Sequence, residues 1–122
     1  MAENFRRAAA LRERLSAQMR GNQDDGWGQP VPGAGPFEEQ FEISAGLRPL
    51  RGSEAVLAAR LEGRQPYVLT VRNTSQTRQI TTSWQFVDKR NPKRVFAVTS
   101  PFADPDGRNA WLEGLVVEGG LS

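Results

Sequence analysis

Cysteine and histidine are both absent from this chain of 122 residues. Without cysteine neither disulfides nor thiolate metal sites can form, and without histidine the commonest general base and metal ligand is missing. The sequence also lacks the G-x-x-x-x-G-K-[ST] phosphate loop and the G-x-S-x-G nucleophile elbow. We therefore expect a protein that is not an enzyme and that uses no cofactor and no metal.

Long apolar runs are scarce as well. The longest uninterrupted run covers residues 55–59, far fewer than the ~20 residues that a membrane-spanning helix needs. No charged-then-apolar leader with a cleavage site opens the chain, so the sequence favours a soluble product of the cytoplasm with no membrane partner. The length predicts one domain, and 12 glycines with 8 prolines predict many turns.

Charge is spread unevenly, although the formal net charge is only +2. Residues 1–20 carry five arginines against two acids, and residues 21–63 carry three arginines against seven acids. Residues 64–122 carry eight basic residues against five acids. Such blocks are compatible with complementary contacts between copies of one chain, or between this chain and a partner.

Residues 41–54 combine a strand with a corner, and the rest of the chain can be ordered around them. Apolar residues alternate with polar ones up to Leu47, which is the period of a half-buried strand, and we expect this strand over residues 37–47. Pro49 cannot donate a ladder hydrogen bond and Gly52 suits a tight turn. The strand is therefore predicted to end at residues 50–52.

A short helix is predicted directly after this corner, over residues 53–63. Ser53 is a natural N-cap and Gly63 a natural C-terminal stop. The expected inward residues are Val56, Leu57 and Leu61.

Further strands are predicted over residues 13–20, 67–72, 80–87, 94–100 and 109–118. Helical spacing also fits residues 13–20, and a short helix or arm is expected over residues 1–12. The polar residues 73–79 are interpreted as a hairpin loop or a strand end, and residues 88–93 and 101–107 as turns. Gly114 predicts a bulge or a close approach. Together these elements predict a mainly β protein: a small antiparallel β-barrel with one short helix, a barrel over residues 13–118 and a tail over residues 119–122.

The longest predicted loop covers residues 21–36, which contain five glycines and three prolines. Trp27 lies in its middle and has two possible roles. It can fold back onto the barrel as a lid, or it can anchor on a neighbouring subunit, because tryptophan is enriched in binding hot spots.

Basic residues in the second half of the chain raise the possibility of nucleic-acid binding. Small barrels bind single strands through basic grooves and stacking aromatics, here Trp84 and Phe86. However, Trp84 and Phe86 lie at every second position together with Ile80 and Thr82, and this alternation assigns the two aromatics to the core instead. The carboxylate pairs of the chain lie beside turn residues, which favours a conformational role: Asp24 and Asp25, Glu38 and Glu39, Asp104 and Asp106.

Residues 45–54 resemble the strand, P-L-S-G-x-E, helix signature of the tailed-phage head–tail joining proteins, also called head-closure or stopper proteins. The matching residues are Leu47, Pro49, Leu50, Arg51, Gly52, Ser53 and Glu54. The order Arg51-Gly52-Ser53-Glu54 departs from the Ser-Gly-x-Glu that is frequent in the family. Residues 25–28 stand in place of the family's first turn. The family's closing pattern is matched by Val98, Asp104, Asp106, Arg108, Trp111, Leu112, Leu115 and Val117.

The resemblance covers about residues 11–118, favours a strand over residues 13–20, and implies a structural virion protein without catalytic residues, from a tailed phage or a gene transfer agent. Copies would form a ring in the virion neck between the portal–adaptor complex and the tail terminator or tail tube. The ring would continue the DNA channel, retain packaged double-stranded DNA without reading its sequence, and assemble in the host cytoplasm. Sixfold and twelvefold rings, and adaptor, stopper and tail-completion roles, are all compatible with the residues.

The expected interface or channel residues are Trp27, Arg72, Arg78, Lys89, Arg90 and Lys93. The alternative function is a small monomeric barrel that binds single-stranded nucleic acid through its basic loops.

Overall fold

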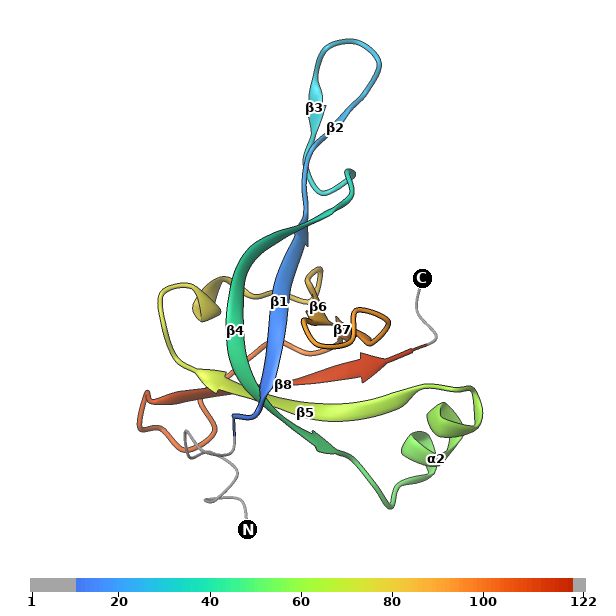
Figure 1. Cartoon of the computed structure of the whole chain (residues 1–122), viewed down its shortest axis with the longest axis vertical. Coiled ribbons are helices and arrows are strands. Elements are labelled where there is room, and N and C mark those ends of the chain that lie inside the picture. Colours follow the sequence, from blue (N-terminus) through green and yellow to red (C-terminus); the bar gives the residue numbers. More distant parts are fainter. Residues whose placement is uncertain (1–10, 120–122) are drawn as a thin grey trace.

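The computed structural model describes residues 11–119, which form a closed antiparallel barrel with a projecting hairpin and one α-helix outside the wall (Figure 1). The elements in chain order are β1 (Glu13–Arg20), β2 (Gln23–Asp24), β3 (Pro30–Val31), β4 (Phe37–Pro49), α2 (Glu54–Leu61), β5 (Gln65–Arg72), the 3-10 helix η2 (Thr77–Gln79), β6 (Gln85–Asp88), β7 (Val95–Val98) and β8 (Trp111–Glu118). Around the barrel the strands follow the order β1, β4, β5, β8, β7, β6. The predicted mainly β barrel with one short helix is therefore confirmed.

Residues 1–10 and 120–122 lie outside the described residues, and with them most of the expected N-terminal helix or arm and most of the expected tail. Within residues 11–119, no helix combines the length and the apolar character needed to cross a bilayer.

β4 is the longest strand and belongs to two parts of the barrel wall. Its first part pairs with β1, from Phe37 opposite Arg20 to Ala45 opposite Glu13, and its last part, residues 46–49, pairs with β5. A register shift after Ala17 marks a β-bulge in β1, which increases the local twist. The predicted central strand is confirmed, and it ends at Pro49, directly before the predicted corner, where a residue without an N–H can close a strand.

The corner after β4 also forms as the sequence predicts. The N–H of Val56 donates a hydrogen bond to Ser53 Oγ at 3.1 Å, which is the expected N-cap. Gly63, with a φ of 82°, follows the end of α2 in the left-handed conformation that favours glycine.

The inward face of α2 was predicted only in part. Val56 is buried, but Leu57 is 52% exposed and Leu61 is 90% exposed, so the prediction for these two leucines is wrong. The helix packs against β5 at the end of the barrel and does not lie across an open sheet. Only the face that carries Val56 therefore meets the wall.

All six barrel strands contribute side chains to one core. Phe86 and Phe96 are fully buried, and the ring of Tyr67 packs edge-on against Phe96 at a centroid distance of 5.7 Å. Gly114 makes the predicted close approach, because a Cβ at this position would lie 2.5 Å from the ring of Phe102. The buried members of the core are Leu15, Ala17, Ala45, Leu69, Val71, Ile80, Trp84, Phe86, Phe96, Val98, Leu112 and Val116.

The strand predicted over residues 80–87 begins later than expected, at Gln85. Residues 81–84 form a turn instead, in which the N–H of Trp84 donates to the carbonyl of Thr81 at 3.1 Å. Ile80 and Trp84 are buried as predicted, but Thr82 is exposed, which corrects the prediction. The alternation suggested a strand here because the turn buries Ile80 and Trp84, as a strand would.

Residues 73–79 are neither a hairpin loop nor a strand end, because β5 and β6 are not neighbours in the barrel. They cross between the two strands and contain η2, and Thr77 is fully buried there. Its hydroxyl donates to the carbonyl of Arg72 at 2.6 Å and accepts from the N–H of Thr74 at 2.8 Å. A polar side chain thus replaces backbone partners that the crossing segment lacks.

Candidate interaction surfaces

Residues 21–36, which we call the arm, project away from the barrel beyond the ends of β1 and β4 (Figure 1). The sequence predicted a loop without regular structure, and that prediction is wrong. The arm contains a small antiparallel sheet, with Gln23 opposite Val31 in β2 and β3.

Hydrogen bonds close the base of the arm, and Arg20 links it to the barrel. The N–H of Gly21 donates to the carbonyl of Pro36 at 3.0 Å, and the N–H of Gly35 donates to the carbonyl of Gly21 at 2.9 Å. Arg20 Nη1 donates to the carbonyl of Gly35 at 3.0 Å, and its guanidinium lies 4.4 Å from the ring centre of Phe37. The arm is therefore held at its base by β1 and β4.

The tip of the arm is ordered by its own two carboxylates. Asp24 Oδ1 accepts hydrogen bonds from the N–H groups of Gly26 and Gly28, at 2.9 and 3.2 Å. Asp25 Oδ1 accepts from the N–H groups of Trp27 and Gln29, at 2.7 and 3.2 Å. Aspartate stabilises turns in this way, so the tip has a set conformation without any contact to the core.

Trp27 is presented at this tip with 88% of its surface exposed. The lid interpretation is therefore wrong for this structure, because the arm carries the indole away from the barrel and the local turns hold it there. The other interpretation, an anchor on a neighbouring molecule, stays a prediction.

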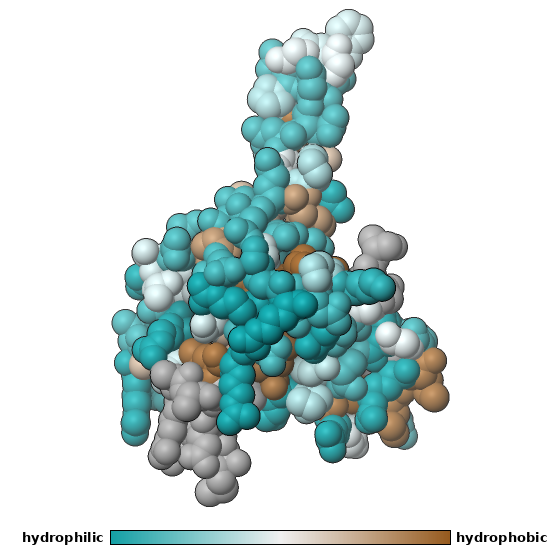
Figure 2. Space-filling view, in the orientation of Figure 1, coloured by the Kyte–Doolittle hydropathy of each residue, from teal (hydrophilic) through white to brown (hydrophobic). Residues whose placement is uncertain are grey.

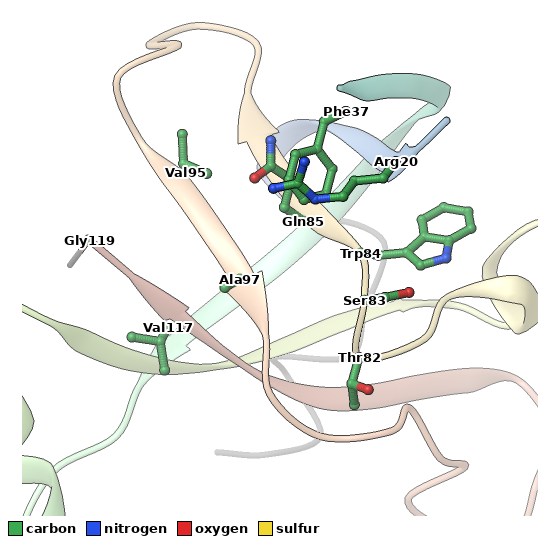
Figure 3. Close-up of a pocket in the computed structure, with 10 residues that line it drawn as sticks. All are labelled: Arg20, Phe37, Thr82, Ser83, Trp84, Gln85, Val95, Ala97, Val117 and Gly119. Atoms are coloured by element: carbon green, nitrogen blue, oxygen red, sulfur yellow. The ribbon is translucent and has the colours of Figure 1, made fainter. Parts of the chain in front are cut away.

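A pocket of about 170 Å³ lies where the arm meets the barrel (Figure 3). The side chains of Arg20, Phe37 and Gln85 lie together, across the pocket from Val95 and Val117 (Figure 3). The full lining is Arg20, Phe37, Thr82, Ser83, Trp84, Gln85, Val95, Ala97, Val117 and Gly119. It contains no carboxylate, and its one charged group is stacked on an aromatic ring. The lining combines polar side chains with apolar ones, and it offers no acid–base pair.

Two of the predicted basic residues lie after or at the end of β5. The guanidinium of Arg72 lies 5.2 Å from the ring centre of Trp111, which is a cation–π contact. Arg78 Nε donates to the carbonyl of Thr74 at 3.2 Å. Both arginines are exposed.

The other three lie in the turn between β6 and β7. Lys89 Nζ is 3.2 Å from Glu39 Oε1 and 3.7 Å from Glu42 Oε1. Arg90 Nη1 donates to the carbonyl of Arg12 at 2.9 Å. Lys89 and Arg90 thus help to hold the turn against the barrel wall, and Lys93 is exposed on the same turn.

The two aromatics considered for nucleic-acid stacking are both in the core. Trp84 is 4% exposed and Phe86 is fully buried, which confirms the assignment made from their alternation. The ring of Trp84 packs against Phe41 at a centroid distance of 5.8 Å. Neither ring is available to stack on a base.

Ion pairs between strands were not visible in the sequence. Arg94 contacts Glu118 at 3.2 Å and the buried Asp88 at 3.3 Å, and Arg14 contacts Glu42 at 2.8 Å. Glu118 lies in β8, and Arg14 and Glu42 lie in β1 and β4, so the barrel brings these partners together. Arg94 and Asp88, by contrast, face each other across the short turn between β6 and β7. On β4, Glu39 and Glu42 meet cations of their own chain.

The electrostatic effects of these contacts are local. The hydroxyl of Ser16, and after it the ammonium of Lys89, lower the pKa of Glu39 by stabilising its carboxylate. Burial, and after it the negative charge of Glu118, raise the pKa of Tyr67.

Asp104 confirms the conformational role predicted for the acid pairs near turns. Its carboxylate accepts from the N–H groups of Asn109 at 2.6 Å, Gly107 at 3.0 Å and Asp106 at 3.2 Å. Burial acts to raise the pKa of Asp104, but these hydrogen bonds outweigh it and lower the pKa. Among residues 11–119, no group of three or more potential ligands is arranged to hold a metal ion.

The exposed leucines of α2 form a surface that the sequence prediction missed. Leu57 and Leu61 are separated by one helical turn, so they form their own stripe beside Val56. Figure 2 shows apolar surface at the edge of the molecule where α2 lies. The i, i+4 spacing of the leucines was the available signal, because one short helix cannot bury two separate stripes against one wall.

Comparison with known proteins agrees with this architecture. A family model described as phage head completion protein matches residues 6–119. The chain belongs to this family. Its fold is similar to that of a chain in the virion of a native gene transfer agent particle, with a TM-score of 0.58 and 17% identity over 89% of this chain and 94% of that one. It is also similar to protein SF1141 from Shigella flexneri 2a, with a TM-score of 0.64 and 19% identity over 94% and 98%. No curated protein matches the chain.

Membership in the phage head completion family confirms the resemblance found in the sequence and identifies the chain as a structural component of a virion. The family is one of structural proteins and not of enzymes. The two solved structures show that the barrel fold is shared.

Proposed function

We propose that the chain is the subunit of a ring in the neck of a tailed phage or a gene transfer agent. The ring lies between the portal–adaptor complex and the tail, and it continues the channel through which double-stranded DNA passes. The observation that carries this proposal is the ordered arm of a head completion protein, with an almost fully exposed tryptophan at its tip.

The division between barrel and arm supports a role in assembly. The barrel is closed, so its strands have neighbours on both sides around the wall. Contacts with other molecules then depend on side chains and not on a free strand edge. Contacts between unlike surfaces of identical copies produce rings when their rotation closes.

The modest charge supports passage of DNA without tight binding. Strong contacts to many phosphates would hold the DNA in place, whereas a net charge of +2 gives only mild attraction. Lys89 and Arg90 also donate hydrogen bonds to Glu39 and Arg12 of the same chain. Retention of packaged DNA would then depend on the shape of the closed ring.

The proposed partners are other copies of this chain, the portal or adaptor protein, and the tail terminator or tail tube protein. The residues proposed for these contacts, or for the channel wall, are Trp27, Arg72, Arg78, Lys89, Arg90 and Lys93. The exposed positions of Trp27, Arg72, Arg78 and Lys93 are compatible with this role.

Complementation tests this proposal. Particles that lack the chain are expected to contain heads without tails and to leak DNA, and the wild-type gene is expected to restore tailed, infectious or transducing particles. Electron microscopy of restored particles is expected to place a ring of the chain between portal and tail. Normal tailed particles without the chain would overturn the proposal. So would a salt-sensitive complex of the monomer with single-stranded DNA and no incorporation into particles, which is the outcome expected of the rival nucleic-acid function.

A further inference from the structure

We propose that the arm tip of one subunit docks on α2 of the next copy, with Trp27 packed against Leu57 and Leu61. This contact rests on the proposed ring and specifies which surfaces build it. It accounts for the two most exposed large apolar side chains among the described residues, Trp27 and Leu61, with one interface.

Both surfaces expose apolar area that folding of the monomer does not explain. Scattered exposed apolar residues are normal, but an indole held at 88% exposure by a structured turn is not a residue that failed to reach the core. On the other side, Leu61 at 90% and Leu57 at 52% exposure lie on one stripe of α2. Tryptophan is enriched among the hot spots of protein interfaces.

The geometry requires that the contact be made between molecules. The arm tip and α2 lie at opposite ends of the molecule, with the barrel between them (Figure 1). Trp27 therefore cannot reach the α2 of its own chain. A tip-to-helix contact joins two different surfaces, and such head-to-tail contacts produce a ring when the rotation between copies closes.

The charges of the two surfaces are complementary. The arm contains two acidic residues, Asp24 and Asp25, and no basic residue. Around α2, the arginines Arg51, Arg60 and Arg64 exceed the acids Glu54 and Glu62 by one charge, and the carboxylate of Glu62 is paired with Arg64. An acidic tip and a basic helix border attract each other and set the orientation of the docked arm.

Both partners are ordered before they meet. Carboxylate hydrogen bonds define the turn that carries Trp27, and Ser53 and Val56 fix α2 on the barrel. Binding therefore orders few additional rotamers, which keeps the entropy cost of association low.

Cross-linking tests the contact, and the absence of native cysteine makes it clean. Gln29→Cys lies beside Trp27 and Ala58→Cys lies on the exposed side of α2, and neither removes a side chain proposed to bind. A short bis-maleimide is added to an equimolar mixture of the two single variants over a range of protein concentrations. The matched control replaces Ala58→Cys with Ser83→Cys, which lies at the pocket beneath the arm.

A cross-linked heterodimer of Gln29→Cys with Ala58→Cys supports the contact, and the double variant is then expected to give a ladder of covalent oligomers. A stronger cross-link to Ser83→Cys, or to Gln29→Cys of a second copy, would overturn it. An uncross-linked chain would also overturn it, whether the chain assembles or stays monomeric. Incorporation into particles, measured by complementation, tests the ring function separately, so the two failures are distinguishable.

The affinity of self-association, measured for single and double variants, tests the energy of the same contact. Trp27→Ala is expected to weaken it about 30-fold and Leu61→Ala about 10-fold, which are hot-spot effects. If the two side chains touch, the double variant loses little more than Trp27→Ala alone. Arg60→Glu is expected to weaken assembly, whereas Arg108→Glu, in a loop on the other side of the barrel, is the charge-matched control. Additive losses in the double variant would contradict direct contact.

Discussion

Two tryptophans of this chain lie in opposite environments. Trp84 is 4% exposed and packs against Phe41 from a distant strand, whereas Trp27 is 88% exposed on a turn held by its immediate neighbours. In the barrel, residues far apart in sequence share a dry core, so burial provides the stability. In the arm, the hydrogen bonds of Asp24 and Asp25 at the tip join residues two to four positions apart, so the surface remains available to another molecule. Burial in the barrel therefore stabilises the fold, whereas local hydrogen bonds hold the arm in its conformation without a core of its own.

Truncation of the buried tryptophan gives the largest expected effect. Trp84→Ala removes a large side chain from the core and leaves a cavity, so we expect a loss of about 3–5 kcal/mol in the free energy of unfolding. Urea denaturation followed by circular dichroism measures this loss. A loss below about 1 kcal/mol would mean that Trp84 is not part of a close-packed core.

The next largest loss of stability is expected from residues 73–79, which cross between β5 and β6, because Thr77 places a buried hydroxyl there. Thr77→Val keeps the shape but leaves the N–H of Thr74 and the carbonyl of Arg72 without this partner. The expected cost is about 1–3 kcal/mol in the free energy of unfolding. Thr82→Val, at an exposed position in the next turn, is the matched control and is expected to change stability little.

The N-cap of α2 tests an element that packs on the barrel but lies outside its wall. Ser53→Ala removes the acceptor of the Val56 N–H and is expected to cost about 1 kcal/mol. Amide hydrogen exchange should show faster exchange confined to α2, because the helix lies outside the barrel wall. Ser53→Asp supplies another good cap and is expected to restore protection; failure to do so would point to a role of Ser53 other than capping.

A smaller effect is expected from the pH dependence of the loop before β8. The pKa of Asp104 is lowered in the folded state, so its ionised carboxylate contributes stability above the unfolded pKa, and this contribution is lost as the pH falls through the folded pKa. Stability should therefore decrease below about pH 4 more steeply in the wild type than in Asp104→Asn. Equal slopes for the two proteins in thermal melts would remove this carboxylate from the acid sensitivity of the fold.

The smallest effect on stability is expected in the arm. Trp27→Ala removes an exposed ring and should change the free energy of unfolding by less than about 0.5 kcal/mol. Paired with Trp84→Ala, the same substitution thus separates folding from assembly. A large loss of stability in the isolated Trp27→Ala monomer would show that the indole packs on its own barrel, as a lid.

Most of the barrel was predictable because its strands carry their own periodicity. Residues 37–47 alternate, Ser53 and Gly63 mark the ends of a helix, and Gly114 marks a close approach, and each of these features is present in the structure. The strand predicted over residues 80–87 was too long, because alternation does not distinguish a strand from a turn that buries the same residues.

The sequence by itself therefore determined a small β-barrel without the usual reactive side chains, because turn residues and apolar spacing act locally. Only the tertiary structure decided that Trp27 points away from the barrel and that Leu57 and Leu61 stay uncovered. Both results depend on where the closed wall ends and on which face of a short element meets it. Those are properties of the assembled strands, and the i, i+4 spacing of the leucines shows only that they share a stripe.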